Sequence, residues 1–226
     1  MNLQPGGQPF IVCLAGPNGA GKSTFYELFL SGLPVALVNA DRIASLLPAA
    51  RPRGDYEAAK LAEMERRRLV SEGASFVMET VFSDPQRAKA GFLVGAERKG
   101  YFVALVYIGL SSAGLCAARV AHRVRNGGHA VPANRIAKRY GRSLDNLARV
   151  IDRLAMARLY DNSGGGFELV AECVRGWRLY KAPTIPAWAA PAASRMAIGR
   201  RNPGGQPAIV SLLARSAPGR GRPSGA

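Results

Sequence analysis

Residues 10–24 read FIVCLAGPNGAGKST, and within them residues 16–23 match the pattern GxxxxGK[ST]. An apolar run short enough for a buried strand precedes the match, and a stretch with helical periodicity follows it, as this phosphate-binding loop requires. Glycines let the backbone wrap its N–H groups around phosphate oxygens, and the following helix adds its positive N-terminal end. The motif predicts a nucleotide site made by Gly16, Pro17, Asn18, Gly19, Ala20, Gly21, Lys22, Ser23 and Thr24.

Apolar runs alternate with stretches of helical periodicity over the first 180 residues. The expected strands are 10–15, 35–38, 75–78, 102–110 and 167–171, and the expected helices are 21–31, 56–72, 85–98, 112–126 and 143–160. Asp84 before Pro85 and the hydroxyl of Ser143 provide start signals for two of these helices. This alternation predicts an α/β fold with a five-stranded, mostly parallel sheet and helices on both faces.

Composition and charge divide the chain into two parts. With 226 residues and 48% hydrophobic content it can bury one substantial core. All fifteen acidic residues precede residue 174, whereas 182–226 hold six arginines, no acid and many Pro and Gly residues. We expect a nucleotide-binding domain at 1–181 and a disordered basic tail at 182–226, in which residues 208–215 could form a short helix.

The net charge of +16 indicates which kinds of molecule the protein could bind. An excess of Lys and Arg favours polyanionic partners such as nucleic acid or phosphorylated small molecules, although genomic base composition can produce the same excess. Three cysteines without CxxC spacing fit a reducing cytoplasm. Neither a signal peptide nor an apolar run long enough to span a bilayer is evident, so we expect a soluble cytoplasmic protein.

Two carboxylates follow predicted strands and are candidates for chemistry. The chain has no LSGGQ-like motif, and strand 102–110 does not end in an acid, so a kinase is favoured over a transport ATPase. Asp41 and Glu79 follow the second and third strands, at the same sheet edge as the phosphate loop. Asp41 is a candidate general base or, alternatively, the N-cap of a helix at 42–47. Glu79 could orient substrate or Mg²⁺, or be an ordinary strand-end carboxylate.

The segment 119–142 joins two expected helices through Gly127-Gly128 and is rich in arginine. Mobile helical lids of nucleotide kinases bring arginines over the transferred phosphate, so we interpret this segment as a lid. The arginines that could act in this way are Arg123, Arg125, Arg135 and Arg139. A solvated pair of basic helices is the alternative.

Several separated pieces together resemble the zeta toxin-like kinases over residues 10 to about 180: GPNGAGKST at 16–24, NAD at 39–41, ET at 79–80, RVRNGGHAVP at 123–132, RYGRSLDNL at 139–147 and YDNS at 160–163. The resemblance implies transfer of phosphate from ATP, with Mg²⁺, to a UDP-N-acetylamino sugar, and inhibition by an antitoxin protein. It implies that Lys22 and Ser23 hold phosphates and Mg²⁺ and that Asp41 is the general base. Glu79 and Thr80 would belong to the strand that binds the acceptor, and Arg123 and Arg139 would be catalytic lid residues. Apart from the resemblance, we expect Arg125 of the lid to bind the substrate.

Two other functions remain compatible with the residues. Charge alone supports a nucleic-acid-associated P-loop enzyme such as a 5′-end kinase, without a recognisable nucleic-acid-binding motif beside it. A nucleotide switch without catalysis, in a toxin–antitoxin pair, is the other. Asn162 could hold the nucleotide base or form part of a turn.

Overall fold

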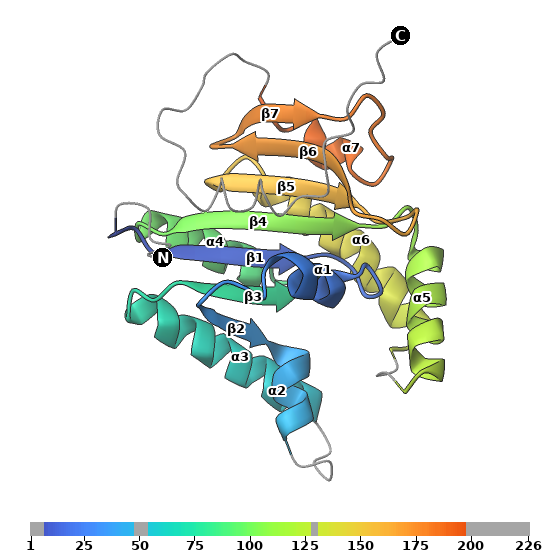
Figure 1. Cartoon of the computed structure of the whole chain (residues 1–226), viewed down its shortest axis with the longest axis horizontal. Helices are drawn as coiled ribbons and strands as arrows, with labels where there is room; N and C mark the ends of the chain where they lie inside the picture. Colours follow the sequence, from blue (N-terminus) through green and yellow to red (C-terminus); the bar gives the residue numbers. More distant parts are fainter. Residues whose placement is uncertain (1–6, 48–53, 128–130, 198–226) are drawn as a thin grey trace.

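The computed structural model describes residues 7–47, 54–127 and 131–197 (Figure 1). Seven strands form one sheet in this part of the chain, in the order β2-β3-β1-β4-β5-β6-β7. The first five in this order pair in parallel, and β6 and β7 extend the sheet by antiparallel pairing. The strands are β1 (Phe10–Ala15), β2 (Ala36–Asn39), β3 (Phe76–Thr80), β4 (Phe102–Gly109), β5 (Met156–Asp161), β6 (Glu168–Val174) and β7 (Trp177–Lys181).

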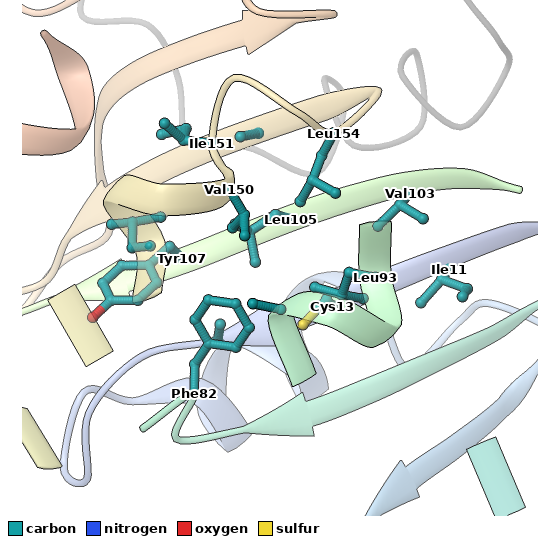
Figure 2. Packing of buried hydrophobic residues seen from close by; sticks show 14 of the residues in the cluster. Ile11, Cys13, Phe82, Leu93, Val103, Leu105, Tyr107, Val150, Ile151 and Leu154 are labelled. Atoms are coloured by element: carbon teal, nitrogen blue, oxygen red, sulfur yellow. The ribbon is translucent and has the colours of Figure 1, made fainter. Parts of the chain in front are cut away.

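Helices pack on both faces of this sheet, as predicted. One core cluster contains residues of α3, α4, α6 and α7, together with one face of the strands. Figure 2 shows part of this cluster, with Leu93 of α4, Val150 of α6 and Leu105 of β4 among the labelled residues. A second cluster, on the other face, contains residues of α1 and α5. The helices are α1 (Lys22–Phe29), α2 (Ala40–Leu46), α3 (Gly54–Ser71), α4 (Ala88–Arg98), α5 (Ala113–Arg125), α6 (Ala133–Val150) and α7 (Ala190–Ala193). The α/β fold is thus confirmed.

The predicted strand number was wrong, because the described residues form seven strands and not five. β5 falls inside the helix expected at 143–160; the true helix, α6, begins earlier and ends at Val150. A strand covered on both faces shows no apolar alternation, so its sequence could be taken for the end of a helix. β7 was missed because its turn from β6 uses Arg175 and Gly176, both at positive φ, in place of the more familiar Asn-Gly.

Both predicted helix starts differ from the structure. α4 begins at Ala88 and not at Pro85, and the Asp84 carboxylate accepts a hydrogen bond from the N–H of Lys89 at 3.2 Å. Ser143 lies buried inside α6 and is not its N-cap. The Ser143 hydroxyl therefore makes tertiary contacts, which are described below.

The segment 183–197 is ordered and contributes buried side chains, so the prediction of a disordered tail from residue 182 was wrong for it; the buried residues are Trp188, Ala189, Ala192, Ala193 and Met196. Trp188 is 5% exposed, stacks on Tyr107 with ring centroids 5.7 Å apart, and covers Gly109. A Cβ on Gly109 would lie 2.3 Å from the Trp188 ring, so only glycine fits there. The rest of the predicted tail, with the short helix at 208–215, lies outside the described residues. Within the described ranges, no helix is long and apolar enough to cross a membrane.

The three cysteines give a test of this packing. Burial raises the pKa of the Cys13 and Cys173 thiols to about 12 and of the Cys116 thiol to about 11. Because the thiolate is the nucleophile, about one thiol in a thousand or fewer is ionised at pH 8. The native protein should therefore react very slowly with Ellman's reagent, and all three thiols should react after unfolding in guanidinium chloride. Rapid reaction of any thiol in the native protein would contradict the packing.

Candidate active site

The phosphate loop between β1 and α1 is held by close approaches that require glycine. Gly16 has φ 142°, and a Cβ there would lie 2.1 Å from the backbone oxygen of Ile108 in β4. Gly21 has φ 89° and stands directly before α1. The Lys22 ammonium donates to the backbone oxygen of Pro17 at 3.1 Å, which curls the loop around the lysine side chain. The loop therefore has the shape that the motif predicts.

Lys22 lies close to two carboxylates. Burial lowers the pKa of the Lys22 ammonium, and the negative charges of Glu79 and Asp41 partly oppose this effect. Burial disfavours a charged amine, and an anion beside it restores the charged form. Phosphate groups in the loop would supply such an anion, so the loop is built to gain stabilisation from a bound polyphosphate.

Asn39 connects the ends of β2 and β3. Its side-chain oxygen accepts from the N–H groups of Asp41 and Arg42 at 2.7 and 3.3 Å, so Asn39 is the N-cap of α2. The alternative in which Asp41 caps this helix is therefore wrong. The Asn39 amide also donates to a Glu79 carboxylate oxygen at 2.8 Å. One residue thus starts α2 and positions Glu79, while the Asp41 carboxylate is left exposed.

Ser23 and Glu79 form an oxygen pair suited to Mg²⁺. The Ser23 hydroxyl lies 3.4 Å from the nearer Glu79 carboxylate oxygen. Mg²⁺ prefers hydroxyl, carboxylate, water and phosphate oxygens, and commonly takes only one or two protein ligands beside substrate phosphates. These residues fit the ion that the sequence predicts.

A cavity of about 920 Å³ surrounds these groups at the carboxyl ends of the parallel strands. Predicted site residues that line it are Asn18, Gly19, Gly21, Lys22, Ser23, Thr24, Asp41, Glu79, Thr80, Arg123, Arg135 and Arg139. Gly16, Pro17 and Ala20 support the loop from behind, outside the lining. Arg125 ends α5 with an exposed side chain and does not line the cavity, so the structure does not bring it to the site.

α6 holds the loop that follows β3. The Ser143 hydroxyl donates to the backbone oxygen of Val81 at 2.7 Å, so the Tyr107 hydroxyl, 2.8 Å away, must donate to it. The Asn146 amide donates to the backbone oxygens of Phe82 and Asp84 at 3.0 and 3.2 Å. These bonds fix a strained segment, because Phe82 has φ 60° without being glycine. The conspicuous RYGRSLDNL piece therefore shapes one cavity wall.

The YDNS segment at 160–163 supports the phosphate loop from the other side. The Asn162 amide donates to the backbone oxygen of Ala20 at 2.9 Å, and Arg119 donates to the backbone oxygen of Asn162 at 2.7 Å. Asp161 accepts from the Ser163 hydroxyl at 2.7 Å and from the Trp188 indole at 3.0 Å. In the structure Asn162 supports the loop backbone.

Sequence reasoning missed the cavity wall opposite the phosphate loop. Its residues come from α3 and from the start of α4, and include Tyr56, Lys60, Glu63, Arg66 and Lys89. Their spacing of three or four residues places the α3 members on one helix face. That spacing was visible in the sequence, but nothing local to α3 indicates that this face turns toward the phosphate loop.

Asn39 gives a test of the strand-end network. Asn39→Ala removes the α2 cap and the hydrogen bond to Glu79, and should lower the free energy of unfolding by about 2 kcal/mol. Asn39→Ser keeps a capping oxygen and should recover about 1 kcal/mol of this loss. Urea denaturation followed by circular dichroism measures both variants. Equal stability of Asn39→Ala and the unmodified protein would contradict the network.

Comparisons with known proteins agree with this geometry. The model of the zeta toxin family matches residues 2–165. An uncharacterised protein of Haemophilus influenzae is 30% identical over 129 residues, which cover 55% of this chain and 88% of the relative.

Solved structures show the same fold at low identity. A chain of the PezAT chromosomal toxin-antitoxin system of Streptococcus pneumoniae has a TM-score of 0.59 and 16% identity, with 92% of this chain and 84% of that chain covered. A chain of the AvrRxo1-ORF1:-ORF2 complex with ATP has a TM-score of 0.59 and 16% identity, with 92% and 71% covered. The family match spans the phosphate loop, both strand-end carboxylates and the whole predicted lid segment, and the chain therefore belongs to the zeta toxin family.

Proposed function

We propose that this chain is an ATP-dependent kinase that transfers the γ-phosphoryl group to a hydroxyl of a small anionic acceptor. The observation that supports this proposal best is that one cavity is lined by the phosphate loop, Asp41, the Ser23–Glu79 pair and several arginines. Family membership adds to it. Phosphoryl transfer needs alignment and charge neutralisation more than covalent chemistry, and these residue types supply both.

In the proposed reaction the acceptor hydroxyl oxygen forms a bond to the γ-phosphorus, and the bond from that phosphorus to the β–γ bridging oxygen breaks. The Asp41 carboxylate receives the hydroxyl proton, and ADP leaves with the bridging oxygen. The loop N–H groups and Lys22 hold the phosphates of ATP. Ser23 and Glu79 would hold Mg²⁺, which neutralises phosphate charge when bound.

In this proposal, arginines from the predicted lid neutralise the remaining negative charge of the phosphates. Arg123 of α5 and Arg139 of α6 line the cavity, as do Arg135 and Arg142 of α6. Guanidinium groups match phosphate oxygens in a bidentate manner and stabilise charge that develops during transfer. Arg123 also acts on Lys22, since its positive charge contributes to the lowered pKa of that ammonium.

The wall opposite the phosphate loop supports an anionic acceptor, which we propose to be a UDP-N-acetylamino sugar. Lys60, Arg66 and Lys89 line this wall together with Tyr56, a residue that is 74% exposed. Arg66 is 7% exposed, and its guanidinium lies 6.0 Å from the centre of the Phe92 ring. Basic groups suit a diphosphate, and an exposed aromatic ring suits a base. The toxin–antitoxin context of the Streptococcus relative supports an antitoxin protein as a partner.

The base assignment can be tested with Asp41→Asn. This change keeps the size of the side chain but replaces one acceptor oxygen with an NH2 donor. The amide cannot take up the proton, so kcat should fall about 100-fold to 10,000-fold. ATP affinity, measured with a fluorescent nucleotide, should stay within about threefold. Asp145→Asn, on the exposed side of α6, is the matched control. Full turnover by Asp41→Asn would exclude this role.

The acceptor class can be tested with labelled ATP and Mg²⁺. We expect label on a UDP-N-acetylamino sugar in a panel that also contains nucleosides and short oligonucleotides, and no transfer by Lys22→Ala, which lacks the phosphate-binding ammonium. Label on an oligonucleotide 5′ end would favour the nucleic-acid kinase. Nucleotide binding with no labelled acceptor, or with slow release of free phosphate alone, would favour the nucleotide switch.

A further inference from the structure

A second cavity lies outside the active site and is lined mainly by residues of α4 and α6. These two helices cover the same face of the sheet (Figure 1). The cavity has a volume of about 490 Å³, and we name it the arginine groove. Leu93 and Val150, from the two helices, point into the core beneath it (Figure 2). Its lining residues are Arg87, Ala90, Gly91, Val94, Gly95, Arg98, Arg149, Val150, Arg153 and Arg195.

Five arginines line this small volume, and no acidic residue is among the described residues that do so. Arg195 pairs with Asp152 at 3.0 Å, and the other four arginines form no ion pair with a described residue. Like charges that converge on a hollow repel one another and concentrate counter-ions there. The charge of the groove therefore favours an anion over a cation or an apolar ligand.

The floor of the arginine groove is kept open by two glycines of α4. Gly91 and Gly95 are one helical turn apart, and a Cβ added to either would meet no atom within 4 Å. Glycine inside a helix is less favourable than alanine, and neither residue has the positive φ that would require it. The packing of this chain thus leaves room for larger residues, and the glycines keep the hollow between the arginines.

We propose that the arginine groove binds a small anion that carries two or more phosphate groups. Guanidinium forks match phosphate oxygens, and the volume lies in the range of small-molecule sites. No aromatic or amide side chain is among the described lining residues, so the groove offers neither a stacking platform for bases nor amide groups to read them. The ligand is therefore recognised by its phosphates, which favours a compact polyphosphorylated molecule over single-stranded nucleic acid.

The arginine groove is distinct from the active site. No described lining residue is shared by the two cavities, and Arg142 of the active-site cavity and Arg149 of the groove are seven positions apart along α6, or about 10 Å. A phosphate probe would also reach the phosphate loop. The test therefore uses the full chain with Lys22→Ala in every sample, which weakens phosphate binding at the loop.

Isothermal titration with inorganic tripolyphosphate at low salt measures the binding. Two variants change the groove in different ways: Arg98→Glu with Arg153→Glu reverses charge on both walls, and Gly91→Leu fills the floor without changing charge. The matched control, Lys138→Glu with Lys181→Glu, changes net charge equally at exposed positions outside both cavities. Thermal unfolding checks that each variant is folded, and Gly91→Leu should raise Tm because leucine is the better helix former.

We expect both groove variants to weaken one tripolyphosphate-binding event about tenfold or more, while the control stays within about threefold. Unchanged affinity in folded Gly91→Leu would overturn the proposal, and so would an equal loss in the control, which would show that net charge alone attracts the probe. A third result would also overturn the proposal: the protein does not bind tripolyphosphate but binds a single-stranded oligonucleotide, and both groove variants lose that binding. The ligand of the groove would then be nucleic acid. None of these outcomes depends on kinase activity.

Discussion

The contact between Gly16 and the backbone oxygen of Ile108 is the constraint on which the site depends. A Cβ at residue 16 would lie 2.1 Å from that oxygen, so the loop can leave β1 only by passing directly over β4. Gly19 approaches the backbone oxygen of Cys116 in α5 in the same way, at 2.9 Å from its added Cβ. With the Asn162 bond to Ala20, the loop is held between β4, α5 and the end of β5. The strand order therefore determines the phosphate site.

The parts of the site that the sequence predicted are those where local chemistry and topology coincide. The phosphate loop is a continuous motif, and Asp41 and Glu79 follow parallel strands that must end at one edge. Asn39 connects the ends of β2 and β3, but the sequence shows it only as part of the NAD piece at 39–41. The hydrogen bond from its amide to Glu79 is a tertiary contact, which the sequence does not reveal. The wall formed by α3 was missed for the same reason. That wall depends on where α3 packs relative to the phosphate loop, and the sequence of α3 alone does not indicate this position.

Two of the errors in the fold share a physical origin. β5 and the segment around Trp188 are stabilised by contacts that are distant in the sequence: β5 by β4, and Trp188 by Tyr107 and Gly109. Their own residues give weak local signals, either an apolar run that suits a helix or a Pro- and Ala-rich segment that suits a linker. Ser143 shows the same effect. Its hydroxyl suggested a helix N-cap, but Ser143 lies inside α6 and its hydroxyl donates a hydrogen bond to the backbone oxygen of Val81, in the loop after β3. Tertiary contacts override local preference at these positions.

The anchoring of α6 limits which parts of the cavity wall can move. Ser143 and Asn146 hold the loop after β3, and Leu147 and Val150 lie in the core, so the second half of this helix cannot move without breaking buried hydrogen bonds. Arg135 lies two turns before this anchor, where most side chains are exposed. Local motion is drawn from regions with few buried contacts. Any movement of the cavity arginines must therefore come from the first turns of α6 and from α5, while the loop after β3, which the second half of α6 fixes, stays in place.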